Sequence, residues 1–495
     1  MKTTRRILIR VALGCVFGLA AVAAGEAGAS AAKSSIPAHY QKIKFPQWTY
    51  TPPFPPDYRV ELAGGAIAYL VPDTTLDLLK VEVYSAYAMQ PKSPGETASL
   101  RLYSSLLKDG GAGALSPEQL EDSLEFVAAE MGAGLSDWQG SLSLDCLSGN
   151  GPELMNLLPD LALKPRLDSA VFRINQRTMV EGLRHRYDTP RGVMGKFYEM
   201  TMQGSHPANW SPTEKEVSGT PLKELEVYRG MGFPTSKLVL AVAGKFDKPA
   251  MIERLNTLIK RFGSGKPARD PRPFRGPLPP GVYWVDKPFT QATIRIAAPG
   301  VMRPSPDYYP LTVASYILGD GGFTSRLVAK VRSQEGLAYG VSSDIESDYH
   351  RRGSVSVGLQ TKVETGAYAI RLVLDEIAKM AKEGISDEEL AKAKDGLLKS
   401  LPSLFDSPAA TASIFAQSEI WGRKPDHFLD YEKTIKGLTK TQVEDVFRKY
   451  FVPDSMRIMV VGPKAALLSE DAHGLSLKSF GKVVEMNTAD LDKRE

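Results

Sequence analysis

An arginine and a tyrosine stand seven residues apart in "VRSQEGLAYG" (residues 331 to 340), with Gly336 between them. We expect a helix that ends at Gly336 and passes directly into a strand, which would turn the Arg332 guanidinium and the Tyr339 phenol toward the same place. A guanidinium offers a rigid fork of donors to carbonyl or carboxylate oxygens, and a phenol adds one more hydrogen bond. The alternative is structural: Arg332 complements a helix C-terminus and Tyr339 fills a position in a sheet.

Other patterns able to do chemistry are weak in this sequence. The glycine stretches "GAGAL" and "GSGK" lack the strand, helix and Lys-Ser/Thr context of a phosphate loop, and no serine stands in a Gly-x-Ser-x-Gly elbow. Glu388 and Glu389 fall on an amphipathic pattern, where we expect solvated carboxylates. Cys146 lies in a strand pattern and is expected to behave as a small core residue.

The N-terminus has the composition of an export signal. Four basic residues (Lys2, Arg5, Arg6 and Arg10) precede an apolar run from Val11 to Ala24, and an Ala-x-Ala pattern ends at Ala29. We expect residues 1–29 to be a cleavable signal peptide, of ordinary or twin-arginine type, and the mature protein to be exported, most simply to a bacterial periplasm. No later apolar run reaches the roughly 18 residues of a membrane span.

Composition limits the partners. The chain of 495 residues is 43% hydrophobic and 24% charged, which is typical of a soluble globular protein with two or more domains. Loss of residues 1–29 removes four basic residues and one acidic residue, so the formal net charge falls from +4 to +1. A near-neutral protein argues against nucleic acid as the main partner. Cys15 leaves with the signal, and Cys146 alone cannot form an intramolecular disulfide.

The two halves of the chain repeat one another. "VYRGMGFPTSKLVLAVAG", which ends at Gly244, and "VFRKYFVPDSMRIMVVG", which ends at Gly462, share a helix end, a turn with proline and a buried strand. Upstream, Asp188 and Asp406 each begin an Asp-hydroxyl-Pro sequence that interrupts a helical pattern. Asp188 and Asp406 lie 218 residues apart, as do Gly244 and Gly462. Two copies of a domain of roughly 200 residues follow from this repeat.

Each copy begins with alternating strand patterns and continues with amphipathic helices, such as residues 116–133, where Ser116 with Gln119 makes a helix start. The predicted fold class is α+β: two similar α/β-sandwich domains, each an antiparallel-rich sheet with helices on one face and the other face free. The predicted segments are a signal peptide (1–29), an extended N-terminal strap (30–57), a first domain (58–262), a linker rich in Pro and Gly (263–280), a second domain (281–465) and a peripheral tail (466–495).

The motifs resemble those of one known family. "GGFTSRL", "VR" and "GLAY" in the second half, with "ETASLRLYSSLLKDGGAG" and "VEGLRHRYDTP" in the first, are similar in order and spacing to the pitrilysin and insulinase family of zinc peptidases, which includes mitochondrial processing peptidase. The resemblance implies a clamshell of two domains around a chamber, with extended peptides held by added strand pairing. It also implies that Arg332 and Tyr339 grip the peptide and that the strand near Gly134, Leu135 and Ser136 pairs with it.

The zinc-binding motif of that family is missing. Active members carry His-x-x-Glu-His on the first-domain helix before the glycine, where the histidines bind zinc and the glutamate activates water. If Gly110 sets the register, the three positions are Arg101, Ser104 and Ser105. If Gly111 sets it, they are Leu102, Ser105 and Leu106. Neither register supplies a metal ligand.

Glu181 matches the place where active members keep a third, carboxylate ligand. A single carboxylate cannot hold catalytic zinc without companions. A glutamate on a solvated helix face is the structural alternative, and His185, four residues later, is expected to be a surface residue. We therefore predict no catalytic residue, metal or cofactor in this chain, with zinc expected only in an active partner.

Three functions are compatible with the sequence. The favoured prediction is an exported, non-catalytic homologue that binds extended peptides as the partner subunit of an active zinc peptidase of the same family, or in a pair with itself. The second is a stand-alone periplasmic peptide-binding or chaperone-like protein. The third is an active metallopeptidase with atypical ligands.

Overall fold

The computed structural model of the chain describes residues 42–43, 50–87, 89–265 and 276–494. The predicted signal peptide, the first part of the predicted strap and residues 266–275 of the predicted linker lie outside these residues. The chain divides into two compact units, Met1–Tyr50 and Thr51–Glu495, and the second unit holds the strands and α-helices described below. The described end of the strap is irregular apart from a short 3-10 turn at Pro55–Asp57.

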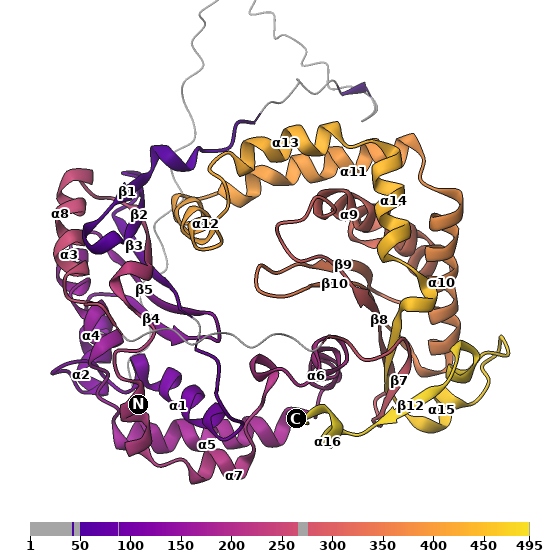
Figure 1. The fold of residues 1–495 in the computed structure, drawn as a ribbon, viewed down its shortest axis with the longest axis horizontal. Helices are drawn as coiled ribbons and strands as arrows, with labels where there is room; N and C mark the ends of the chain where they lie inside the picture. The colour runs from indigo at the N-terminus through magenta and orange to yellow at the C-terminus, as the bar shows by residue number, and fades with distance from the viewer. Residues whose placement is uncertain (1–41, 44–49, 88, 266–275, 495) are drawn as a thin grey trace, which may run out of the picture. The chain divides into compact units, whose positions relative to one another are not determined.

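Two six-stranded sheets form the framework of the second unit (Figure 1). The strands of the first sheet are β1 (Arg59–Glu61), β2 (Ile67–Pro72), β3 (Leu78–Ala86), β4 (Glu130–Leu135), β5 (Gln139–Leu147) and β6 (Leu238–Gly244), in the order β1-β2-β6-β3-β5-β4. The strands of the second are β7 (Gly281–Asp286), β8 (Gln291–Pro299), β9 (Val341–Glu346), β10 (Ser354–Lys362), β11 (Arg457–Gly462) and β12 (Val483–Met486), in the order β12-β7-β11-β8-β10-β9.

The pairing is mostly antiparallel, as the alternating patterns predict. The exceptions are β2 with β6 in the first sheet, and β11 and β12 with β7 in the second. β6 and β11 occupy the same place in their sheets and end on Gly244 and Gly462, so the repeat read from the sequence is a repeat of structure.

Helices of the first half are α1 (Glu96–Asp109), α2 (Pro117–Phe126), α3 (Gly151–Leu154), α4 (Leu157–Leu163), α5 (Ser169–His185), α6 (Pro190–Gln203), α7 (Glu214–Gly219) and α8 (Lys248–Ile259). Those of the second are α9 (Tyr308–Ser315), α10 (Gly366–Glu383), α11 (Asp387–Ser400), α12 (Pro408–Ile420), α13 (His427–Gly437), α14 (Lys440–Tyr450), α15 (Lys464–Leu468) and α16 (Thr488–Leu491). Thr189 and Ser407 cap α6 and α12, which places both helices directly after the repeated Asp-hydroxyl-Pro breaks.

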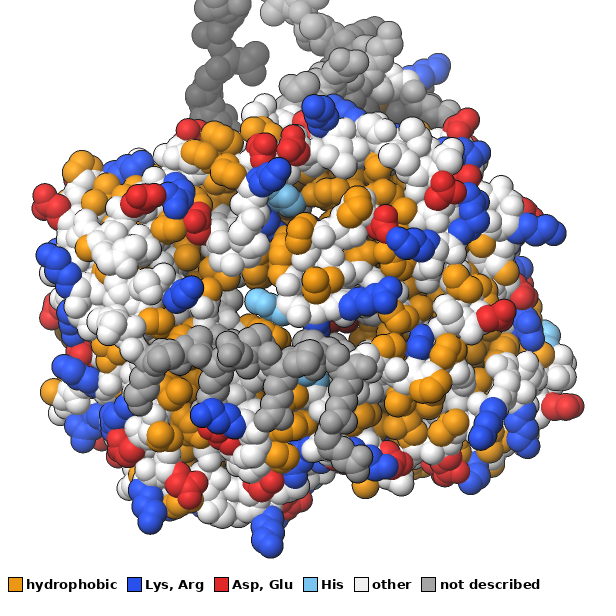
Figure 2. Space-filling model, viewed as in Figure 1, with side chains coloured by type: hydrophobic (Ala, Val, Ile, Leu, Met, Phe, Trp, Pro, Cys, Tyr) orange, Lys and Arg blue, Asp and Glu red, His pale blue; other side chains and the backbone are white. Residues whose placement is uncertain are grey.

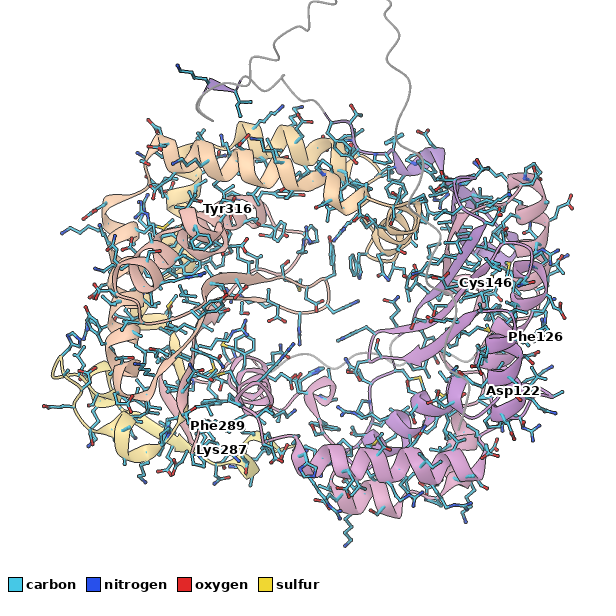
Figure 3. All side chains as sticks on the ribbon, turned by 180° about the vertical axis from the view of Figure 1, so that it is seen from behind. Asp122, Phe126, Cys146, Lys287, Phe289 and Tyr316 are labelled. Carbon is cyan, nitrogen blue, oxygen red and sulfur yellow. The ribbon has the colours of Figure 1, made fainter. Side chains whose placement is uncertain are left out.

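One face of each sheet packs on the helices of its own half. Ala68 and Leu70 of β2 belong to the first core, and Ile294 and Ile296 of β8 belong to the second. Cys146, on β5, is buried in the first core and forms no disulfide, as its strand pattern indicates, whereas Phe126 at the end of α2 is 91% exposed (Figure 3).

The opposite face of each sheet carries a helix from the other half. α12 packs on β6, β2 and β3, and Tyr69, which points away from the first core, meets Phe415 of α12 at a ring distance of 5.7 Å. α6 in turn packs on β8 and β11, where Phe197 shares a cluster with Ala297 and Met459. Both phenylalanines are fully buried. The two halves are therefore joined by a reciprocal exchange of helices, and the face expected to be free is partly covered.

Two segments differ from the sequence prediction. The helix expected over residues 116–133 ends at Phe126, because Ala128 adopts a positive φ of 49° and Glu130 begins β4. The prediction of a peripheral tail was wrong, since β12 pairs with β7 and Leu491 of α16 is fully buried in the α6 cluster. A short edge strand and a four-residue helix bury few side chains, so the tail keeps a polar composition.

Candidate functional site

Helix α1 presents Arg101 and Ser104 to a recess. The two side chains line a cavity of about 250 Å³ together with Leu135, Ser136 and Asp137. Leu102 and Leu106 are instead fully buried in the core. The structure thus distinguishes the two registers that the sequence left open. Arg101 and Ser104, from the register set by Gly110, face the recess, whereas Leu102 and Leu106, from the register set by Gly111, face the core. Ser105 belongs to both registers.

Ser104 is bonded to the edge of the first sheet. Its Oγ accepts a hydrogen bond from the backbone N–H of Leu135 at 2.8 Å and lies 3.1 Å from the Leu135 carbonyl oxygen, to which it donates. Leu135 ends β4, which pairs only with β5 among the described strands. The free edge of β4 therefore lies beside α1, and its last residue is already held by a side chain of that helix.

Arg101 and Asp137 are the charged groups of the recess. Arg101 donates to the carbonyl oxygen of Trp210 at 2.8 Å, and burial lowers its pKa, although its side chain remains accessible from the cavity. Burial raises the pKa of Asp137 to about 6, and the positive charge of Arg101 opposes that shift. No ion pair joins these two residues in the described part of the chain, so each charge remains available to a ligand.

The remaining predicted zinc-site positions do not converge on the recess. Ser105 donates to the carbonyl oxygen of Leu102 at 2.9 Å and contacts the side-chain amide of Asn175 on α5. Glu181 pairs with Arg184 at 2.6 Å and lies 3.7 Å from His185, with all three side chains more than half exposed. Asn175, which belongs to no recognisable motif, is thus the α5 side chain that meets Ser105.

The described residues contain no group of three or more His, Cys, Asp or Glu side chains placed to hold a metal ion. Arginine and serine at the α1 positions provide no lone pairs suited to zinc. The residues of this recess therefore do not fit the catalytic zinc of the active peptidases.

Arg332 and Tyr339 lie together on the second half, as their spacing predicts. The π-helix η9 (Val328–Gln334) ends before Gly336, which has a φ of 63°, and β9 begins at Val341. The guanidinium carbon of Arg332 stands 4.8 Å from the Tyr339 ring centroid and 4.6 Å from that of Phe323. Tyr339 is 89% exposed, so it does not fill a sheet position. The role of this pair in holding a peptide stays a prediction.

A second cavity joins the two halves. Trp138, in the turn between β4 and β5, stacks on His350, in the turn between β9 and β10, at a ring distance of 4.3 Å and an interplanar angle of 2°. Both rings line a cavity of about 320 Å³ that Ser136 also reaches. Ser136 is therefore common to this cavity and to the α1 recess, which makes them neighbours along the end of β4. Trp138 and Asp137 carry no motif, and only the hairpin brings them here.

The described part of the chain has no helix with the length and apolar composition that a bilayer crossing requires. Acidic and basic side chains are interspersed over the face shown in Figure 2, without a broad region of one sign.

The fold and the recess define a class of protein: a two-domain, peptidase-like α+β fold whose helix α1 lacks zinc ligands. Residues 234–397 match the family described as "Peptidase M16 inactive domain". An uncharacterised zinc protease of Mycobacterium bovis is 24% identical over 342 residues, which cover 67% of this chain and 76% of the relative. The non-peptidase homologue YmxG of Helicobacter pylori is 30% identical over 192 residues, which cover 38% of this chain and 44% of the relative.

Solved structures agree with this class. A peptidase M16 inactive domain from Pseudomonas fluorescens has a TM-score of 0.73 at 22% identity and covers 82% of this chain and 97% of its own. A protease from Helicobacter pylori has a TM-score of 0.71 at 17% identity, with coverages of 82% and 99%. The chain is a homologue of the M16 peptidases, the pitrilysin and insulinase family recognised in its sequence, and it lacks the His-x-x-Glu-His motif.

Proposed function

We propose that this non-catalytic M16 homologue binds extended peptides along the edge of β4 and acts as the partner subunit of an active zinc peptidase of the same family. The observation that carries the proposal is the free edge of β4 beside a recess lined by Arg101 and Ser104, which by the resemblance match a zinc ligand and the catalytic base of active members. An exposed edge strand pairs readily with an added extended chain.

The bond between Ser104 and Leu135 sets a condition on peptide pairing. A peptide strand that reaches the end of β4 must exchange Ser104 for its own backbone groups at Leu135, whose N–H and carbonyl face the free edge. The backbone groups of Gly134 face β5 instead, so the preceding position of this edge is Ala133. In this proposal the half-buried Arg332 and the exposed Tyr339 of the second half hold the peptide.

Copurification tests the partner role. The full-length chain, tagged at its C-terminus in its own host, should retain a relative that carries His-x-x-Glu-His, and chelation should abolish the peptidase activity of that complex. Arg332→Ala should reduce peptide turnover by the complex while leaving the complex assembled. A lone monomer with no recoverable M16 partner would contradict the partner role.

A stand-alone peptide-binding protein is the second candidate. It is favoured by the cavity around Trp138 and His350, because residues of both halves of one chain complete it. Calorimetry of the isolated protein with extended peptides separates the candidates: affinity without a partner, lost in Arg332→Ala, supports the stand-alone role. Both candidate functions include export of the protein. N-terminal sequencing of the native protein should therefore find a mature chain that starts at Ser30.

A further inference from the structure

Two arginines from separate segments of the second half share a pair of adjoining cavities. Arg303 precedes α9, and Arg423 lies between α12 and α13. Both line the cavity that contains Trp138 and His350, and both line a further cavity of about 470 Å³. Because the two cavities have these arginines in common, the guanidinium groups stand where the cavities meet.

Aromatic rings hold both guanidinium groups in place. The Cζ atom of Arg303 lies 3.8 Å from the Tyr308 ring centroid and 5.3 Å from that of Tyr349. The Cζ atom of Arg423 lies 5.5 Å from the same Tyr349 centroid and 4.7 Å from the Trp421 ring. Tyr349 and Trp421 are themselves stacked, with an interplanar angle of 9°. Two cations thus approach one tyrosine ring, an arrangement that a bound anion would stabilise.

Neither guanidinium has a carboxylate partner among the residues that the structure describes. Arg423 donates its Nε–H to the Tyr349 hydroxyl at 2.8 Å, which leaves its terminal nitrogens directed elsewhere. The nearby carboxylate of Asp348 lies 3.4 Å from Arg351 and accepts the backbone N–H of His350. His427 also lines the larger cavity, and burial, followed by the charges of Arg423 and Arg303, lowers its pKa to about 4. Asp348 lines the smaller cavity with the two arginines, but its carboxylate is paired with Arg351, so the site holds two guanidinium groups without a carboxylate partner of their own.

The proposed peptide path leads to this site. Ser136 follows the last residue of β4 and lines both the α1 recess and the cavity of Trp138, and that cavity reaches the two arginines. A peptide added to the edge of β4 would leave the strand at this point with its next residues directed toward Arg303 and Arg423.

We propose that Arg303 and Arg423 bind a carboxylate of the bound peptide, either its C-terminus or an acidic side chain, while Tyr308, Tyr349 and Trp421 pack against the adjoining apolar groups. The inference rests on the proposed peptide binding and names its substrate class: peptides that carry a carboxylate beside apolar residues. Planar guanidinium groups match a carboxylate with two parallel hydrogen bonds, which favours this anion over a point charge.

The test compares matched ligands by calorimetry on the full-length protein. The probes are three hexapeptides of alanine and phenylalanine. The first has a free C-terminal carboxylate, the second is amidated and carries one internal glutamate, and the third is amidated and carries glutamine in place of that glutamate. N-acetylphenylalanine and its amide serve as probes small enough to enter the cavity without pairing with β4. We expect at least one carboxylate-bearing hexapeptide and N-acetylphenylalanine to bind about tenfold more tightly than their uncharged counterparts.

The variants identify the residues responsible. Arg303→Gln and Arg423→Gln should each abolish this preference, Arg303→Lys should keep part of it, and Arg173→Gln, on the exposed face of α5, should leave it unchanged. Circular dichroism and melting temperature confirm that each variant is folded. The hexapeptide that shows the preference distinguishes the C-terminus from an acidic side chain.

The outcomes separate this inference from the proposed function. Equal binding of acid and amide forms by the wild-type protein would overturn the carboxylate site and leave peptide binding intact. Binding of N-acetylphenylalanine through the arginines without binding of any hexapeptide would keep the site and overturn peptide binding. Absence of binding for every probe would overturn both.

Discussion

Asp137 makes the recess sensitive to pH. Burial raises its pKa from 3.8 to about 6 in the folded protein, so between roughly pH 4 and pH 6 the folded chain binds a proton that the unfolded chain has released. The stability that this group contributes is therefore present below pH 4 and is lost as the pH rises through 6.

The first prediction follows from that sign. Asp137→Asn should stabilise the protein relative to wild type by on the order of 2 kcal/mol at pH 7 and by almost nothing at pH 4. Urea denaturation at several pH values between 4 and 7 measures the difference. Asp122→Asn, on the exposed face of α2, is the matched control and should track the wild type (Figure 3). A constant offset at every pH would contradict the burial of a charged carboxylate.

Ser104 gives the second prediction. Ser104→Ala removes both hydrogen bonds to Leu135 and should lower the free energy of unfolding by about 1–2 kcal/mol. If peptides pair with the end of β4, the same change should also tighten their binding, because no side chain then competes for the Leu135 backbone. Ser123→Ala, which loses a bond within its own helix, is the control. Weaker peptide binding in Ser104→Ala would place the serine in contact with the ligand.

Individual residues could be predicted from the sequence where a local motif defines them. The spacing of Arg332 and Tyr339 around a left-handed glycine brought the two together, and the absence of histidine before Gly110 was readable directly. Asn175, Asp137 and the pair Arg303 and Arg423 were not found, because they lie in unremarkable segments and only tertiary packing assembles them.

Elements were predicted well where the pattern is local. The capping box at Ser116 and the strands β5, β6 and β11 lie where their patterns indicate, whereas the start of β4 was expected to be helical and β12 was not expected. The surface on which a helix packs cannot be predicted from a local pattern, since it depends on residues far along the chain. α12, "PAATASIFAQSEI", has small and apolar residues on most sides, and this composition was the available indication that it packs against another domain.

The exchanged helices give the third prediction. Phe415 on α12 is fully buried and meets Tyr58 and Tyr69 of the first half, so Phe415→Ala should cost about 3–5 kcal/mol and loosen the first sheet as well as the second half. Hydrogen exchange should show faster opening of β2 and β6. Phe126→Ala, at a side chain that is 91% exposed, should change stability by less than about 0.5 kcal/mol.

The polar contacts of α12 support the same interface. Glu419 accepts hydrogen bonds from Arg59 at 3.1 Å and from the Tyr69 hydroxyl at 2.6 Å. Burial opposes ionisation of Glu419, but these hydrogen bonds prevail and lower its pKa. A half-buried carboxylate that is paired across the halves favours one relative placement of α12 on the first sheet.

The whole molecule gives the fourth prediction. Because α1 offers arginine and serine where zinc ligands are required, the purified chain should hold less than a tenth of an equivalent of zinc and should show no chelator-sensitive cleavage of quenched peptides. Metal analysis after purification without added zinc measures the first quantity. A stoichiometric ion together with turnover would restore the hypothesis of an active peptidase with atypical ligands.

The reciprocal packing of α6 and α12 also determines how the chain can be divided. If the gene is cut within the linker and each half is expressed alone, each half would expose the hydrophobic side of a helix that packs on the missing half. Each half alone should therefore aggregate. The same two fragments produced in one cell should recognise each other and reconstitute the native protein, as a split reporter does, without any covalent bond between them.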